Sequence, residues 1–379
     1  MAPNGVNDLY LALIESTPVI NGRYHQPRRL AGAVKEGYFS LIFQARDMQT
    51  GREVVLKFFD PRHDSNQYRR EAFRREARLL AEFSGQPNIL LELLEGEQAF
   101  EKPVTTREGI TVPFRMSYFA TELAPGSLKD YIYSEANNPR DSLVLFRETC
   151  KGVQRIHSRD VVHRDLKPGN CLIFPGLVVK LCDFGTARKL GEAGLASRYD
   201  LPVGDLGYTA FEFFCGMGNN PKFLPGADFF SLGAILFELF TRQILTQLVY
   251  DFQVLENLSQ LFARDIEEDE RKDQVDRLLP SILGKWVLPE LSTVQNLVPP
   301  SIRGRVNLLY KRLAELDYRN RARLTFEWIF REIDICVKIL DNEEKYQRWL
   351  EFRRRRQQHR ELRQARVLRK QVLIGQGDS

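Results

Sequence analysis

The chain has 379 residues, of which 43% are hydrophobic and 28% are charged, and its formal net charge is +5. This composition is ordinary for a soluble globular protein. The length allows two or three hydrophobic cores, or one two-lobed domain with an extension.

The chain has five cysteines, at positions 150, 171, 182, 215 and 336, in no CxxC spacing. An odd, scattered set argues against a disulfide framework or a zinc site and predicts reduced thiols in the cytoplasm. The N-terminus has no basic region followed by an apolar run, so we expect no signal peptide. The most apolar window, residues 227–240, is too short to cross a bilayer and predicts a buried core helix. We therefore expect neither a transmembrane segment nor a receptor role.

Residues 1–23 contain one short apolar cluster, at 9–14, and no recognisable chemistry. We predict that this N-terminal extension packs against the lobe that follows. The next segment predicts three strands, at 30–36, 41–46 and 54–59, because apolar, β-branched and aromatic residues are enriched there.

Residues 68–83 have apolar side chains at helical spacing and predict an amphipathic helix. We expect three of its arginines, Arg70, Arg74 and Arg75, to be solvated. Two more strands are predicted at 88–95 and 116–123, and the polar residues 97–113 between them are expected to form a surface loop.

Residues 161–185 read VVHRDLKPGNCLIFPGLVVKLCDFG. A polar loop carries Asp165, Lys167 and Asn170, two strands expected to be mostly buried follow, and Asp183 comes directly after them. Phosphoryl transfer needs a carboxylate to accept the proton of a hydroxyl, a cation to offset charge, and oxygen ligands for Mg²⁺. The pattern therefore predicts Asp165 as the base, Lys167 as the cation, and Asn170 and Asp183 as metal ligands.

The order HRDLKPGN, followed thirteen residues later by DFG, resembles the catalytic and metal-binding loops of the eukaryotic-type (Hanks-type) Ser/Thr protein kinases. The resemblance covers residues 24–340, apart from 241–301. It implies a two-lobed α+β fold, with a five-stranded antiparallel sheet and one regulatory helix above a larger, mainly helical lobe. It also implies Mg²⁺-dependent transfer of the γ-phosphoryl group of ATP to Ser or Thr hydroxyls of a protein substrate.

The resemblance extends to the predicted small lobe. Lys57, in VVLK, fits the family's lysine that binds the α and β phosphates, and Glu76 fits the helix glutamate that pairs with this lysine. The family's phosphate loop, GxGxxG, keeps only its middle glycine, Gly37, whose backbone NH can still approach phosphate. This departure suggests the alternative of an ATP-binding pseudokinase that acts as a scaffold.

The resemblance further implies an adenine site between the lobes. Thr121 falls on the gatekeeper position, and the hinge at 122–124 offers backbone groups to the base. The residues expected around adenine are Ile42, Val55, Thr121, Glu122, Ala124 and Leu172.

Two positions of the predicted large lobe match structural residues of the family. Glu212, in GYTAFE, is expected to pair with Arg321, and Asp228, in DFFSLG, is expected to bond the backbone of the catalytic loop. GYTAFE and Arg321 also argue against a second alternative, a small-molecule kinase of related fold.

The segment between DFG and Glu212 suggests regulation. Arg164, directly before Asp165, suggests control by an acidic group, and Ser197, Tyr199 and Thr209 are the hydroxyls available for phosphorylation. Asp205 replaces the family's Thr. Its side chain can accept from Lys167 but cannot donate to Asp165.

Residues 341–379 form a basic tail whose eleven Lys and Arg, against six Asp and Glu, account for the whole net charge. Residues 341–370 lack Gly and Pro and predict a helix, of which Tyr346, Trp349 and Leu350 are expected to dock on the large lobe. The remainder suits a solvated helix, an anionic partner such as nucleic acid or an acidic protein, or a membrane surface. Membrane binding is disfavoured because the segment lacks an apolar face.

These patterns together predict four parts. They are an N-terminal extension (1–23), a small lobe (24–121), a large lobe (122–340, with a divergent or inserted region at 241–301) and a basic helical tail (341–379).

Overall fold

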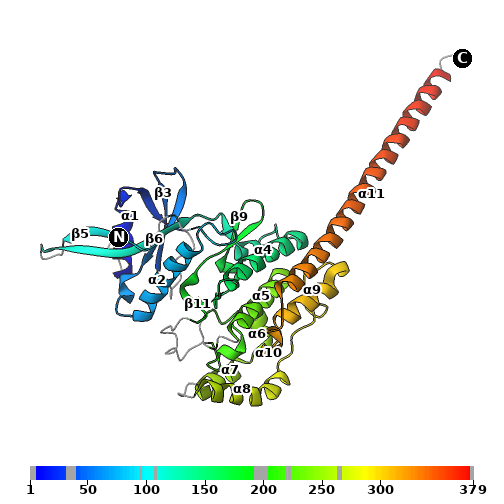
Figure 1. Cartoon of the computed structure of the whole chain (residues 1–379). Coiled ribbons are helices and arrows are strands. Elements are labelled where there is room, and N and C mark those ends of the chain that lie inside the picture. Colours follow the sequence, from blue (N-terminus) through cyan, green and yellow to red (C-terminus); the bar gives the residue numbers. More distant parts are fainter. Residues whose placement is uncertain are drawn as a thin grey trace.

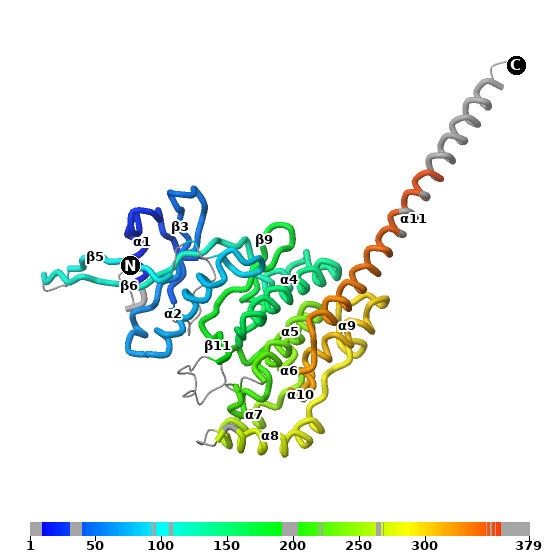
Figure 2. Tube along the Cα trace, in the orientation of Figure 1, coloured from blue at the N-terminus to red at the C-terminus, as the bar shows by residue number. Residues whose placement is uncertain are grey.

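The computed structural model describes residues 6–30, 40–91, 93, 96–105, 109–191, 204–218, 220, 223–262 and 267–375. In this part of the chain a sheet-rich N-terminal lobe lies beside a larger helical C-terminal lobe, which is the α+β arrangement expected (Figure 1). The path of the chain through both lobes can be followed in Figure 2. Gly37, Ser197 and Tyr199 lie outside the described residues.

Six strands form the antiparallel sheet of the small lobe, in the order β1-β2-β3-β4-β6-β5. They are β1 (Val19–Ile20), β2 (Tyr24–Arg29), β3 (Ser40–Asp47), β4 (Glu53–Phe59), β5 (Gln98–Thr105) and β6 (Thr111–Glu122). The prediction of five strands is wrong, because β1 lies in the N-terminal extension, where no strand is expected. The strand predicted at 30–36 falls mostly outside the described residues, and β2 precedes it.

β5 and β6 form a long hairpin. β5 and the start of β6 occupy the predicted loop 97–113, whereas the rest of β6 coincides with the strand predicted at 116–123. They pair from Gln98 opposite Tyr118 to Thr105 opposite Thr111. The strand predicted at 88–95 lies partly outside the described residues; within it, the Leu93 N–H donates to the Ala120 carbonyl and the Leu91 carbonyl accepts the Glu122 N–H, so this segment bonds to β6. The hairpin extends away from the rest of the sheet (Figure 1). Many of its side chains therefore face solvent, and a polar composition there is compatible with a strand.

Different helices pack against the two faces of the sheet. One face packs against helix α1 (Val6–Glu15), whose Leu11 and Ile14 are buried together with strand residues such as Phe43 and Phe58. This packing confirms that the N-terminal extension joins the small lobe. The other face lies against α2 (Gln67–Glu82), the predicted amphipathic helix.

The large lobe is built from helices and short strands. Its helices are α3 (Leu128–Ile132), α4 (Pro139–His157), α5 (Leu224–Thr241), α6 (Leu245–Val249), α7 (Phe252–Phe262), α8 (Glu268–Leu283), α9 (Pro300–Leu313), α10 (Tyr318–Arg321) and α11 (Phe326–Gly375). Its strands are β7 (Gly126–Ser127), β8 (Val161–Val162), β9 (Cys171–Phe174), β10 (Val178–Leu181) and β11 (Arg188–Lys189). The divergent region 241–301 thus contains α6, α7 and α8.

Helix α5 lies at the centre of the large lobe. Among the described helices, it alone is long and apolar enough to cross a membrane, but 94% of it is buried inside the protein. A helix that is apolar on every side is expected in the core of a large domain. The prediction of a core helix is therefore confirmed, although α5 has 18 residues and is longer than the predicted window.

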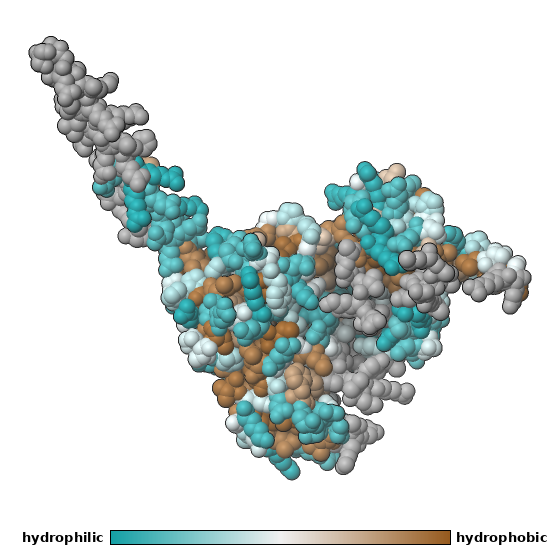
Figure 3. Space-filling model, turned by 180° about the vertical axis from the view of Figure 1, so that it is seen from behind, coloured by the Kyte–Doolittle hydropathy of each residue, from teal (hydrophilic) through white to brown (hydrophobic). Residues whose placement is uncertain are grey.

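The C-terminal helix α11 leaves the large lobe and continues to Gly375 (Figure 1). Where side chains between 351 and 357 are described they are exposed, and apart from Phe352 they are hydrophilic (Figure 3). The side chains of Tyr346, Trp349 and Leu350 lie outside the described part, so their docking remains a prediction.

A largely buried ion pair joins Arg23, directly before β2, to Asp47, the last residue of β3. Asp47 is fully buried and receives two bonds from the Arg23 guanidinium, at 2.8 and 2.7 Å. It also accepts the Gln49 N–H and the Thr50 hydroxyl within the turn. The bonds from Arg23 lower the pKa of Asp47 from 3.8 to about 2.

Arg23→Ala should lower the free energy of unfolding by about 3 kcal/mol at neutral pH, because it leaves the Asp47 carboxylate buried without its cation. Arg28→Ala is the matched control, since its ion pair with Glu53 is exposed and should be worth less than about 0.5 kcal/mol. The folded-state pKa of Asp47 is depressed, so its contribution is present above pH 3.8 and is lost as the pH falls toward 2. Denaturant unfolding across this range measures both effects, and equal losses in the two variants would contradict the assignment.

Candidate active site

The loop between β8 and β9 is held by one buried carboxylate on α5. Asp228 accepts the backbone N–H of His163 at 2.9 Å and that of Arg164 at 3.0 Å. Its second neighbour is His157, whose Nε2 lies 2.8 Å from Oδ2. Burial alone would raise the pKa of Asp228, but the bond from His157 and the positive surroundings lower it. Asp228 therefore takes the position predicted from DFFSLG.

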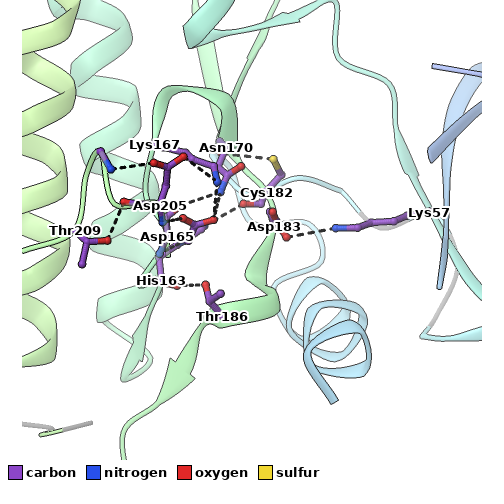
Figure 4. Close-up of polar contacts among 11 residues, drawn as sticks. Lys57, His163, Asp165, Lys167, Asn170, Cys182, Asp183, Thr186, Asp205 and Thr209 are labelled. Carbon is purple, nitrogen blue, oxygen red and sulfur yellow. Dashed lines mark hydrogen bonds and ion pairs between the residues drawn. The ribbon is translucent and has the colours of Figure 1, made fainter. Parts of the chain in front are cut away.

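Asp165 lies on this loop and is surrounded by three polar partners (Figure 4). Its Oδ2 lies 3.0 Å from Lys167 Nζ and 3.1 Å from Asn170 Nδ2. Its Oδ1 accepts the backbone N–H of Asp205 at 2.7 Å. Burial raises the pKa of Asp165, and the charge of Lys167 opposes that rise. The loop thus presents a carboxylate beside a cation, as a base for a hydroxyl requires.

A second cluster of charged side chains joins the two lobes. Lys57, on β4, lies 2.7 Å from a carboxylate oxygen of Glu76 on α2 and 3.4 Å from Asp183 Oδ1. The predicted pairing of Lys57 with Glu76 is therefore present. Burial alone would lower the pKa of Lys57, but Asp183 and Glu76 raise it. For Asp183, burial acts to raise the pKa but Lys57 and Lys167 lower it overall, so the carboxylate is ionised.

The β9–β10 hairpin fixes the second loop against the first. His163 Nε2 lies 3.0 Å from the carbonyl oxygen of Cys182, and Thr186 donates its hydroxyl to the carbonyl of His163 at 3.1 Å (Figure 4). The Phe184 ring packs against the rings of His163 and Phe83. The strands themselves are less buried than predicted, because alternate side chains of β10 are only partly covered.

The expected adenine residues lie on four strands, β3, β4, β6 and β9, and on the connection that follows β6. Ile42 is opposite Lys57 in the sheet, and Val55 is opposite Thr121. Ile42, Val55 and Leu172 are each partly buried, whereas Thr121 is buried. Glu122 ends β6, and its carboxylate binds Lys180 and the N–H of Leu91. Ala124 follows in the connection to the large lobe and is partly buried.

Arg75 has a role that sequence reasoning missed. Its Nη1 donates to the carbonyl of Gly185 at 2.6 Å, so the expectation of a solvated arginine is wrong. Arg75 and Arg188 also lie close enough to Arg164 to affect its titration. Burial, more than these two neighbours, lowers the pKa of Arg164 to about 10. In the sequence, the one signal for the grouping of Arg75, Arg164 and Arg188 is that Arg75 directly precedes Glu76.

Thr209 does not have the accessibility that regulation by phosphorylation requires. It is 6% exposed, and its hydroxyl donates to the carbonyl of Asp205 at 2.8 Å. The prediction of Thr209 as an available hydroxyl is therefore wrong, because the hydroxyl holds the segment in place. Arg321 and Glu212, by contrast, form the predicted pair, and both are buried.

Gly204 allows residues 204–205 to approach the catalytic loop. Its φ is +97°, and a Cβ at this position would lie 2.5 Å from the Arg164 carbonyl oxygen and 3.3 Å from Asp165 Oδ1. Only glycine fits both the backbone conformation and the close contact. This approach brings the N–H of Asp205 to Asp165.

Gly204→Ala should reduce the phosphoryl transfer that the kinase resemblance implies on the order of a hundredfold, because a 1 Å displacement at a reacting group has effects of this size. The matched control is Gly169→Ala on the same loop, where an added Cβ meets nothing within 4 Å and φ is not positive. Peptide phosphorylation kinetics, with a thermal unfolding curve for each variant, make the comparison. Similar rates in the two variants would show that the close approach is unimportant.

Comparisons with known proteins agree with this geometry. The family model for the protein kinase domain matches residues 30–328. Mitogen-activated protein kinase 15 of Mus musculus is 30% identical over 321 residues, which are 80% of this chain and 52% of that protein. Serine/threonine-protein kinase PknA of Corynebacterium glutamicum is 29% identical over 56% of this chain and 42% of its own length. Serine/threonine kinase NLK of Caenorhabditis elegans is 28% identical over 64% of this chain and 36% of its own length.

The chain thus spans about half, or less, of the length of these curated relatives. The matched family domain nevertheless covers most of the chain and contains Lys57, Asp165 and Asp183. The chain belongs to the protein kinase family, in its Hanks-type Ser/Thr group.

Proposed function

We propose that this chain transfers the γ-phosphoryl group of ATP to Ser or Thr hydroxyls of a protein substrate, with Mg²⁺. One observation carries the proposal: two carboxylates on neighbouring short loops are each paired with a different lysine. Asp165 has Lys167 at 3.0 Å, and Asp183 has Lys57 at 3.4 Å. Phosphoryl transfer needs such a division between a base and a metal ligand.

The residues present fit a magnesium ion. The Asn170 side-chain nitrogen donates to Asp165, which directs the amide oxygen elsewhere, and the Asp183 carboxylate is ionised. The described residues contain no group of three or more His, Cys, Asp or Glu that would form a metal site by themselves. Mg²⁺ suits such a site because it keeps waters and takes phosphate oxygens as ligands. When bound, it would neutralise charge on the phosphates.

The other side chains position the reactants. Lys57, braced by Glu76, binds the α and β phosphates, and the Ile42, Val55 and Leu172 side chains enclose adenine. Lys167 offsets charge on the transferred group while Asp165 accepts the hydroxyl proton. Most of the acceleration comes from positioning and preorganised charge.

Helix α2 is the proposed regulatory element. It presents Glu76 to Lys57 and Arg75 to the Gly185 carbonyl, so a movement of the helix would disturb both contacts. A phosphate on Ser197 or Tyr199 would pair with Arg164, whose Nε has no hydrogen-bond partner among the described residues.

The comparisons give no support to two other predictions from the sequence, the scaffold role and the anionic partner. The relatives are named as kinases, and nothing among them supports the scaffold alternative. An anionic partner for the basic tail, either nucleic acid or an acidic protein, likewise has no support and remains a prediction, as does the cytoplasmic location.

Asp165→Asn and Asp183→Ala should each lower kcat on the order of a thousandfold or more, because one removes the base and the other a metal ligand. Purified protein is incubated with labelled ATP, Mg²⁺ and a generic Ser/Thr substrate, and modified sites are read by mass spectrometry. Asp64→Asn, an exposed carboxylate on the small lobe, is the control. Label in all four proteins would show that another enzyme is responsible. ATP binding by an unlabelled wild type would favour the scaffold.

Lys167→Met should shift the acidic limb of the kcat/KM profile to higher pH. Lys167 opposes the rise that burial causes in the pKa of Asp165, so its removal raises that pKa further. Asp165 must be ionised to accept a proton, and activity is therefore lost at a higher pH as acid is added. Lys285→Met, far from the loop and exposed, should leave the limb in place. A reduced rate with an unmoved limb would contradict the coupling.

A further inference from the structure

The carboxylate of Asp205 lies beside the proposed base, Asp165, and its lysine, Lys167. The Asp205 backbone N–H is 2.7 Å from Asp165 Oδ1, and its side-chain Oδ2 is 3.7 Å from Lys167 Nζ (Figure 4). The side chain is 45% exposed, whereas those of Asp165 and Lys167 are largely covered. A substrate segment that brings its hydroxyl to Asp165 therefore passes close to the exposed carboxylate of Asp205.

The position of Asp205 is set by the backbone, not by its charge. Gly204 lets the chain approach the catalytic loop, and the Thr209 hydroxyl holds the Asp205 carbonyl at 2.8 Å. Oδ1 accepts the N–H of Gly207 at 3.0 Å, a bond that an asparagine oxygen can also accept. The negative charge can thus be removed without removing these contacts.

The charges around Asp205 leave the region negative. Lys167 lies between two carboxylates, Asp165 and Asp205, and offsets only one of them. A third carboxylate, Glu238, is buried and accepts hydroxyl bonds from Tyr208 and Tyr133. Burial chiefly raises its pKa, the two hydroxyl bonds and the charge of Lys129 lower it, and the charge of Asp205 raises it, so Lys129 and Asp205 both lie near this group.

We propose that Asp205 is a specificity-determining residue that selects Ser/Thr substrates with Lys or Arg beside the acceptor and disfavours those with acidic or phosphorylated neighbours. This inference rests on the proposed kinase function. A like charge beside a fixed carboxylate is repelled and an opposite charge is attracted, so one group contributes to both selections. At the separations expected in a partly hydrated site, the discrimination is about tenfold.

The test compares peptides that differ only beside the acceptor serine, with Arg, Ala or Glu at each position from two before to two after it. Wild type, Asp205→Asn and Asp205→Thr are assayed for kcat/KM with every peptide. At one or more positions the wild type should prefer Arg over Glu by about tenfold, and both variants should lose most of this ratio. Added salt should also reduce the ratio in the wild type. Asp251→Asn, an exposed carboxylate before α7, should keep it.

Binding supplies a second measurement should a variant transfer phosphate too slowly. The same peptides with alanine in place of the acceptor serine are titrated against each protein, and the ratio of Kd values for the Glu and Arg peptides is compared. A ratio unchanged in Asp205→Asn, with an active wild type, would overturn this inference and leave the kinase function standing. A wild type that binds ATP but phosphorylates no peptide would overturn both.

Discussion

The active site depends on one fully buried carboxylate. Asp228 would be costly to bury alone, and the cost is offset by two backbone N–H bonds and by His157. Those bonds are made to the two residues before Asp165, so they fix the direction from which the base enters the site. Arg164 has a positive φ of 68°, a conformation that persists because its surroundings determine it.

The two lobes are connected by a small number of polar contacts around the DFG loop. Lys57 reaches Asp183 from the sheet, and Arg75 reaches Gly185 from α2. Each contact joins residues more than a hundred positions apart and depends on the placement of α2. The metal-ligand candidate is therefore coupled to the small lobe, which is the geometry that regulation through a movable helix requires.

At Asp165, a backbone N–H takes the place of a side-chain hydrogen-bond donor. The family's threonine is absent, and the N–H of Asp205 supplies a donor to Asp165 instead. This arrangement needs glycine at 204 and leaves the side chain of residue 205 directed toward Lys167 and solvent. The side chain at this position is consequently available for the substrate selection proposed above.

The sequence by itself brought together the residues of the proposed chemistry, because Asp165, Lys167, Asn170 and Asp183 lie on short loops whose spacing limits their separation. It also determined the amphipathic α2 and the apolar α5. The outer part of the β5–β6 hairpin could not be predicted from its residues, since its side chains face solvent, although Phe100 and Met116 nearer the sheet are buried. Arg75 and Thr209 look like ordinary surface residues, and only tertiary contacts bury or bond them. Spacing along the chain fixes local geometry, whereas burial and long-range partners are decided by how the lobes pack.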